Sequence, residues 1–262
     1  MRIPFYQVDA FTNELFKGNP AGVCFVDEYP EDNIMQKIAT ENNLAETAFV
    51  TKVNEDQFFI RWFTPAAEVE LCGHATLASA FILFDKLGYQ KEKVLFDTLY
   101  SGILTVQKED DWLWMDFPAD DIQTAEITDE LKAAFPLRPD SVLKGKTDYV
   151  LVYSLQKQVE EAMPDLQKLA KVNARGVIVT SKGDSVDFVS RFFAPQIGID
   201  EDPVTGSAHT SLTPYWSGVL EKKNLDALQL SKRGGVVKCI SQGDRVIIGG
   251  QACLYLEGTI EI

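Results

Sequence analysis

Histidine and cysteine are scarce in this sequence, which has two histidines and four cysteines among 262 residues. Cys24, Cys72, Cys239 and Cys253 lie far apart and form no CxxC pair, so a disulfide framework is not expected. Reduced thiols in the cytoplasm are the simplest interpretation. Two histidines without a clustered set of ligands also argue against a zinc site, and no metal is predicted.

The sequence also lacks a long apolar run, a signal peptide and an excess of positive charge. No run approaches the roughly 20 apolar residues that span a bilayer, and the N-terminal segment has no apolar core or small-residue cleavage site. With 25 basic and 39 acidic residues, the formal charge is −14. Nucleic-acid binders and membrane-surface proteins usually carry basic patches, so neither partner is expected. GxGxxG, P-loop and GxSxG patterns are absent as well.

The sequence does contain an internal repeat. The segment RWFTP at 61–65 precedes GHAT at 73–76, and RFFAP at 191–195 precedes GSAH at 206–209. RWFTP and RFFAP are offset by 130 residues, and GHAT and GSAH are offset by 133 residues. Both offsets are about half the length of the chain. An ancient duplication would give this arrangement.

Each half alternates short strand patterns with one strongly apolar helix. The first helix is expected over 74–87 and its counterpart over 207–220, where Pro214 should kink or shorten it. A helix that is apolar on all sides needs a sheet around it. The prediction is an α+β fold of two pseudo-symmetric domains, each a curved, mostly antiparallel sheet wrapped around a central apolar helix. The expected domains are 1–118 and 119–262, with the last strand able to pack on the first domain.

One acid distinguishes the two halves. Glu46 enters an apolar strand, and its counterpart at the shared offset of 130 is Gly176. A carboxylate between two apolar-cored units would be desolvated, which raises its pKa and lets it carry a proton near neutrality. We therefore predict that Glu46 is the acid/base group of a site between the halves; an exposed acid at a strand end is the alternative.

Both histidines fall in the repeated glycine motifs, each at a strand-to-helix junction. Gly73 and Gly206 would begin the two apolar helices, where free backbone N–H groups can bind a carboxylate or a developing negative charge. The alternative is that these glycines only permit tight turns and that His74 and His209 are structural.

The second half carries extra acids before its glycine motif. Asp202 precedes Pro203, which favours an extended backbone, and it could accept from a substrate amine or orient Ser207 or His74. Alternatively, Asp202 is an acid at a helix N-terminus and Ser207 is an N-cap.

At these residues the sequence resembles the PhzF-like phenazine-biosynthesis family of the diaminopimelate-epimerase-like superfamily. The segments that carry the resemblance are GNPAGV at 18–23, NLAET at 43–47, RWFTP at 61–65, LCGHAT at 71–76 and DPVTGSAH at 202–209. The resemblance implies two pseudo-symmetric sheets on central helices, a cofactor-free isomerase acting on a small carboxylated metabolite, and a homodimer. It also implies catalytic roles for Glu46, His74, Asp202 and Ser207 and substrate contacts at Gly73, Ala75, Thr205 and Gly206.

The superfamily's epimerases use two opposed cysteines instead. Cys72 stands where the first would be, but the stretch 202–206 holds no second one. A two-thiol mechanism is therefore excluded, and Cys72 is expected to be a small buried packing residue. The expected function is proton transfer within one bound molecule; a non-catalytic ligand- or protein-binding module on the same scaffold is the alternative.

Overall fold

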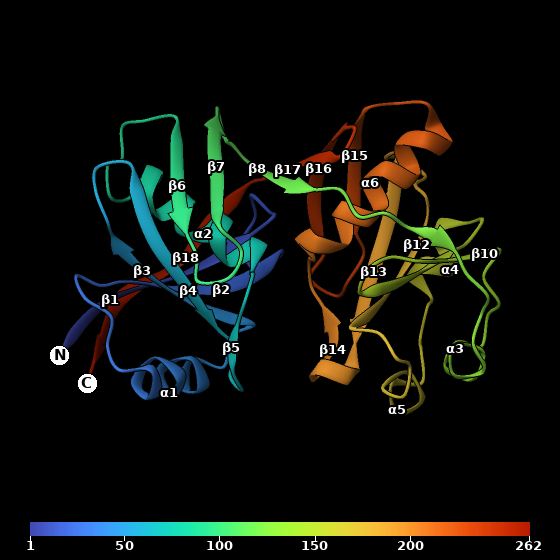
Figure 1. Cartoon of the computed structure of the whole chain (residues 1–262), viewed down its shortest axis with the longest axis horizontal. Coiled ribbons are helices and arrows are strands. Elements are labelled where there is room, and N and C mark those ends of the chain that lie inside the picture. Colours follow the sequence, from blue (N-terminus) through green and yellow to red (C-terminus); the bar gives the residue numbers. More distant parts are fainter. The chain divides into compact units, whose positions relative to one another are not determined.

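A computed structural model describes all 262 residues. Contacts within the chain define two compact units (Figure 1). Unit 1 comprises Met1–Asp116 with Gly249–Ile262, and unit 2 comprises Phe117–Ile248. None of the helices combines the length and the apolar character needed to cross a membrane.

Unit 1 holds both ends of the chain. Its elements are β1 (Arg2–Ala10), β2 (Asn19–Phe25), α1 (Asp32–Asn42), β3 (Glu46–Lys52), β4 (Gln57–Phe63), β5 (Glu68–Val69), α2 (Gly73–Asp85), β6 (Lys93–Asp97), β7 (Ile103–Glu109), β8 (Trp112–Pro118), which runs into unit 2, and β18 (Ala252–Glu261).

Unit 2 is formed by the middle of the chain. Its elements are β9 (Gln123–Thr124), α3 (Asp129–Ala134), β10 (Ser141–Lys144), β11 (Asp148–Val152), α4 (Gln156–Glu160), α5 (Leu166–Leu169), β12 (Gly176–Lys182), β13 (Phe188–Ala194), the 3-10 turn η1 (Pro195–Ile197), β14 (Ile199–Asp202), α6 (Gly206–Leu220), β15 (Asn224–Gln229), β16 (Gly235–Gln242) and β17 (Arg245–Gly250), which returns to unit 1.

Helix α2 is the centre of unit 1. It contacts β1, β2, β3, β7 and β18, and it is buried on nearly all sides. Its few hydroxyls are satisfied within the helix: Thr76 donates to the Cys72 carbonyl and Ser79 to the Ala75 carbonyl, both at 2.7 Å. A largely apolar helix can therefore lie inside the sheet without unpaired hydroxyl groups.

The two units repeat one succession of strand pairings. In unit 1, β2–β3 is parallel, β3–β4 antiparallel and β4–β6 parallel. In unit 2, β11–β12 is parallel, β12–β13 antiparallel and β13–β15 parallel. The fold is thus the expected α+β fold, with a sequence repeat that corresponds to a repeat of topology.

Pro214 does not shorten α6, which continues to Leu220. Proline has no N–H to donate to the carbonyl four residues earlier, and here that carbonyl belongs to Thr210. The backbone N–H of Asp120 donates to the Thr210 oxygen instead, at 3.1 Å. The Thr210 carbonyl is thus satisfied by an incoming loop. Of the two expected effects of Pro214, a kink or a shortening, the shortening was wrong.

Gly176 begins β12 at the place where Glu46 begins β3. A Cβ at residue 176 would run into the ring of Phe192, 2.8 Å from its Cε2 atom. Phe192 is buried and lies on the neighbouring strand β13. The ring therefore fills the space that a side chain at the Glu46 counterpart would need.

Candidate active site

Glu46 and His74 form an ion pair inside unit 1. Glu46 is the first residue of β3 and His74 the second residue of α2, and His74 Nε2 lies 3.0 Å from Glu46 Oε2. Both side chains are largely buried. Both atoms are buried from solvent, so their electrostatic attraction is weakly screened.

The other ring nitrogen of His74 faces two more polar groups. The Asn19 amide nitrogen lies 3.3 Å from Nδ1, and the Cys72 sulfur lies 3.5 Å from it. Asn19 starts β2 directly after Gly18, whose φ of +64° is a left-handed conformation that favours glycine. The GNPAG motif thereby places an amide against the histidine, and a turn of that amide presents its oxygen to a protonated Nδ1.

Burial and charge act in opposite directions on this pair. Burial raises the pKa of Glu46, but the His74 charge and hydrogen bonds from His74 and Cys72 lower it further, so the net direction is downward. Burial likewise lowers the pKa of His74, yet Cys72 and Glu46 raise it well above 6.5. At neutral pH the pair is therefore a carboxylate beside an imidazolium. The expectation that desolvation would leave Glu46 with a raised pKa was wrong, because a buried cation faces it.

Cys72 is buried at the same point. Desolvation, and next the Glu46 charge, raise its pKa to about 11, so it is a neutral thiol rather than a thiolate near pH 7. It contacts the histidine instead of only filling space.

One ligand atom from each of Glu46, Cys72 and His74 lies within 4.8 Å of the others, which is close enough for metal coordination to be considered. This cluster was not identified from the sequence. However, Cys72 faces Nδ1 of the imidazole and Glu46 faces Nε2, and one ion binds a single nitrogen of a given histidine. The geometry therefore suits an ion pair better than metal coordination.

In unit 2, the segment before α6 is tied together by its own side chains. Thr205 donates from its hydroxyl to the Asp202 carboxylate at 2.6 Å. Gln229 accepts from the Thr205 N–H and donates to the Asp202 carbonyl, both at 2.8 Å. The predicted residues Asp202 and Thr205 thus form one rigid turn that leads into Gly206, the first residue of α6.

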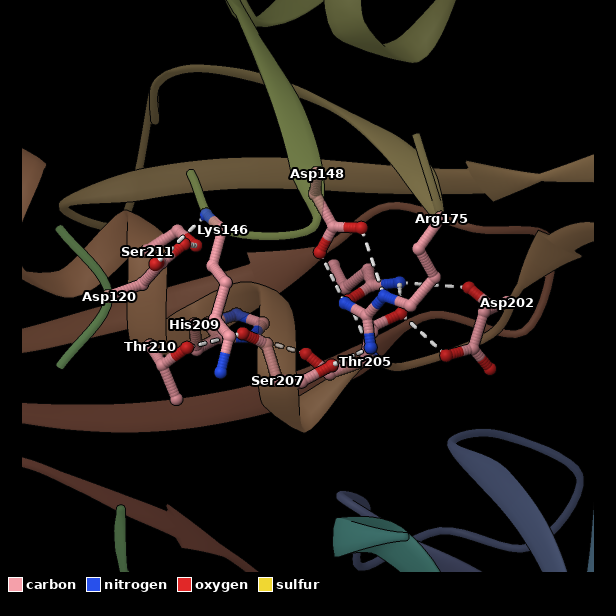
Figure 2. Close-up of polar contacts among 11 residues, drawn as sticks. Asp120, Lys146, Asp148, Arg175, Asp202, Thr205, Ser207, His209, Thr210 and Ser211 are labelled. Atoms are coloured by element: carbon pink, nitrogen blue, oxygen red, sulfur yellow. Dashed lines mark hydrogen bonds and ion pairs between the residues drawn. The ribbon is translucent and has the colours of Figure 1, made fainter. Parts of the chain in front are cut away.

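Ser207 is not the N-cap of α6; that position belongs to Thr205, whose hydroxyl makes no capping bond. The Ser207 hydroxyl instead accepts from Arg175 Nη1 at 3.1 Å (Figure 2). Arg175 directly precedes Gly176, and its partners were not identified from the sequence.

His209 differs sharply from His74. Its ring lies against Phe188 and is buried, and Nδ1 contacts the Thr205 carbonyl at 2.8 Å. Burial lowers its pKa to about 4, so it is neutral at pH 7 and donates to that carbonyl. The structural interpretation holds for this histidine, whereas His74 is charged.

The predicted residues therefore form one cluster within each unit. Unit 1 brings together Glu46, Gly73 and His74, and Ala75 is buried there without an exposed side chain. Unit 2 brings together Asp202, Thr205, Gly206 and Ser207. Three residues were missed as site neighbours: Asn19, Asp148 and Arg175. Two of them could have been noticed from the sequence. Asn19 lies within the GNPAGV segment, and Arg175 directly precedes Gly176, the counterpart of Glu46.

Comparison with known proteins gives a consistent result. The PhzC-PhzF family model, described as phenazine biosynthesis-like protein, matches residues 8–258. Two proteins of Pseudomonas aeruginosa, each named an uncharacterized isomerase, are 49% and 46% identical over 100% of both chains.

Solved structures agree with this match. A phenazine biosynthesis protein of the PhzF family from Enterococcus faecalis has a TM-score of 0.96 at 43% identity, covering 100% of both chains. A probable proline racemase from Agrobacterium radiobacter has a TM-score of 0.69 at 7% identity, covering 99% of this chain and 93% of its own. At 7% identity, the second likeness shows only that this chain shares the fold of diaminopimelate-epimerase-like racemases.

Proposed function

Because this chain belongs to the phenazine biosynthesis-like protein family and is an isomerase like its full-length relatives, we propose that it moves a proton within a small carboxylated metabolite. Glu46 is the acid/base group. The single observation that carries this proposal is the ion pair of Glu46 with a buried, charged His74.

The pair suits proton transfer because the imidazolium keeps Glu46 ionised at neutral pH. An ionised carboxylate can accept a proton from carbon next to an activating group. A base held in position within reach of its proton contributes roughly 10²–10⁴-fold in rate. Returning that proton to another carbon on the same face completes an isomerisation without a net change in protonation.

His74 supports this step by its charge. An imidazolium next to Glu46 keeps the base ionised before the reaction, and it stabilises negative charge that develops on the substrate. The neutral Cys72 thiol, with its pKa raised to about 11, is unsuited to removing a proton. In this proposal Asp202 and Ser207 keep their expected catalytic roles, and substrate contacts remain assigned to Gly73, Ala75, Thr205 and Gly206.

The proposal is tested by solvent deuterium. Small carboxylated metabolites are first screened by thermal shift, and each compound that stabilises the protein is then incubated with it in D₂O. Mass spectrometry should find deuterium on carbon in a recovered compound. Ligands that bind tightly but never acquire deuterium would instead favour the non-catalytic binding module.

The value of kcat/KM should depend on pH through the ionisation of Glu46 and His74. Glu46 must be ionised, and its pKa lies below the ordinary 4.5; His74 must be protonated, and its pKa lies well above 6.5. We expect kcat/KM to be bell-shaped, with the acid limb below pH 4.5 and the alkaline limb above pH 6.5. A profile rising through pH 6 to 7, as a Glu46 with a raised pKa would give, contradicts this assignment.

A further inference from the structure

Three arginines in this chain share one local arrangement. Arg61, Arg175 and Arg191 each form a two-point ion pair with a carboxylate, on Glu68, Asp148 and Glu201 respectively. Each guanidinium also lies over an aromatic ring. Arg61 and Arg191 are counterparts in the internal repeat, whereas Arg175 corresponds to Ala45 and has no equivalent in unit 1.

The two counterpart arginines are largely buried and bind only groups of the protein itself. Arg61 also donates to Asp32, so two acids balance it. Arg191 Nη1 donates to the carbonyls of Val159, Glu160 and Ala162 at 2.7–3.2 Å. Their side chains are only 11% and 13% exposed. Both arginines therefore tie the surrounding chain together, and their low exposure leaves little room for a ligand.

Arg175 is different in its exposure. Its side chain is 34% exposed although Asp148 is buried. A guanidinium has five N–H donors, and Arg175 uses three: two on Asp148 and one on the Ser207 hydroxyl. Two N–H donors are left on a group whose orientation is fixed by Asp148 beneath it and by the Phe192 ring, 5.3 Å from Cζ.

The surroundings of Arg175 are those of a binding group. Figure 2 shows its guanidinium between Asp148 and Ser207, with Thr205 and Asp202 beside it. Ser207 is the hydroxyl that the family resemblance implies for the site, and Arg175 is its partner. Asp148 offsets the arginine's charge, so what remains is a pre-oriented fork of donors that matches the planar shape of a carboxylate.

We propose that Arg175 is the residue that recognises the substrate's carboxylate, binding it with its two remaining N–H groups while Asp148 and Phe192 hold the guanidinium in place. This assignment rests on the proposed function for the view that a carboxylate is bound. It makes Arg175 a specificity-determining residue and Asp148 a positioning residue.

Binding of matched acid and amide probes tests the proposal without turnover. Benzoate and acetate carry a carboxylate, and benzamide and acetamide are their neutral counterparts of similar shape. We expect the wild-type protein to bind at least one acid more tightly than its amide by NMR titration. In Arg175→Lys, which keeps a charge opposite Asp148 but loses the planar fork, this preference should fall by roughly ten-fold or more, the usual worth of a hydrogen bond to a charged group.

Arg191→Lys is the matched control, because it changes an equally paired and ring-stacked arginine that is only 13% exposed. The acid preference of this variant should equal that of wild type. If Arg175→Lys does not fold, the double variant Arg175→Gln/Asp148→Asn removes both charges together. In the unmodified protein, benzoate should slow the reaction of Arg175 with phenylglyoxal, mapped by mass spectrometry, whereas benzamide should not.

The proposal is overturned if wild type does not prefer either acid, if the Arg175 variants keep the preference, or if benzoate leaves Arg175 as reactive as before. These readouts do not involve Glu46. A failure of deuterium exchange with intact acid preference would count against the proposed isomerisation alone, and the reverse result against Arg175 alone.

Discussion

Replacing Glu46 with glutamine should reduce deuterium exchange into the substrate by about 10²–10⁴-fold, the contribution expected of a positioned acid/base group. Glutamine has nearly the shape of glutamate but cannot accept the proton. Ligand affinity by thermal shift should stay close to that of wild type, because the change removes the base and leaves the predicted substrate contacts in place. The loss should therefore appear in kcat rather than in binding.

Glu68→Gln is the matched control for this experiment. Glu68 is also a partly buried acid of unit 1 that pairs with a cation, Arg61, but it has no place in the proposed chemistry. Its variant should exchange deuterium at the wild-type rate. If Glu46→Gln keeps near-normal exchange, or if Glu68→Gln loses as much, Glu46 is not the proton carrier.

Removing the cation from the pair should cost stability as well as activity. His74→Gln leaves the Glu46 carboxylate buried without its counter-charge, and breaking one side of a buried pair costs about 3–5 kcal/mol. In the native protein, the lowered pKa of Glu46 stabilises the fold above about pH 4.5, and this contribution is lost as the pH falls. In His74→Gln, burial alone acts on Glu46 and raises its pKa. The difference in unfolding free energy should therefore be large at pH 7 and shrink in acid.

Urea denaturation of His74→Gln and of Glu46→Gln/His74→Gln measures this directly. The double variant has no buried carboxylate at this point, so it should recover part of the stability that His74→Gln loses at pH 7. A His74→Gln protein as stable as wild type at pH 7, or one whose deficit does not change with pH, would mean that the two side chains are not a buried ion pair.

The sequence was sufficient to predict the architecture because the architecture is repeated. The 130-residue offset, the two apolar helices and the alternating strands all predict the same α+β fold, and the comparisons confirm it. The shortening expected at Pro214 does not occur because the effect of the proline depends on a partner 94 residues away: the Asp120 N–H that donates to the Thr210 carbonyl. Propensity rules describe a helix by its own residues and contain no such partner.

The candidate site was predictable as a set of residues but not as a set of charges. Glu46 and His74 stand out by their motifs, yet the direction of the Glu46 pKa depends on an imidazole 3.0 Å away, and no spacing along the chain gives that distance. Arg175 was overlooked for a similar reason. Its role depends on how many of its donors are occupied, which follows only from the positions of Asp148 and Ser207.

The ring of Phe192 against Gly176 bears on how the two halves can change over time. Any side chain at residue 176 meets that buried ring, so a carboxylate could be introduced there only together with a smaller residue at position 192. That second change would also remove the surface on which Arg175 rests. Placing an acid in both halves of this chain would therefore take at least two substitutions, each expected to be harmful alone. The proposed difference between the acid of unit 1 and the arginine of unit 2 is for this reason difficult to reverse one mutation at a time.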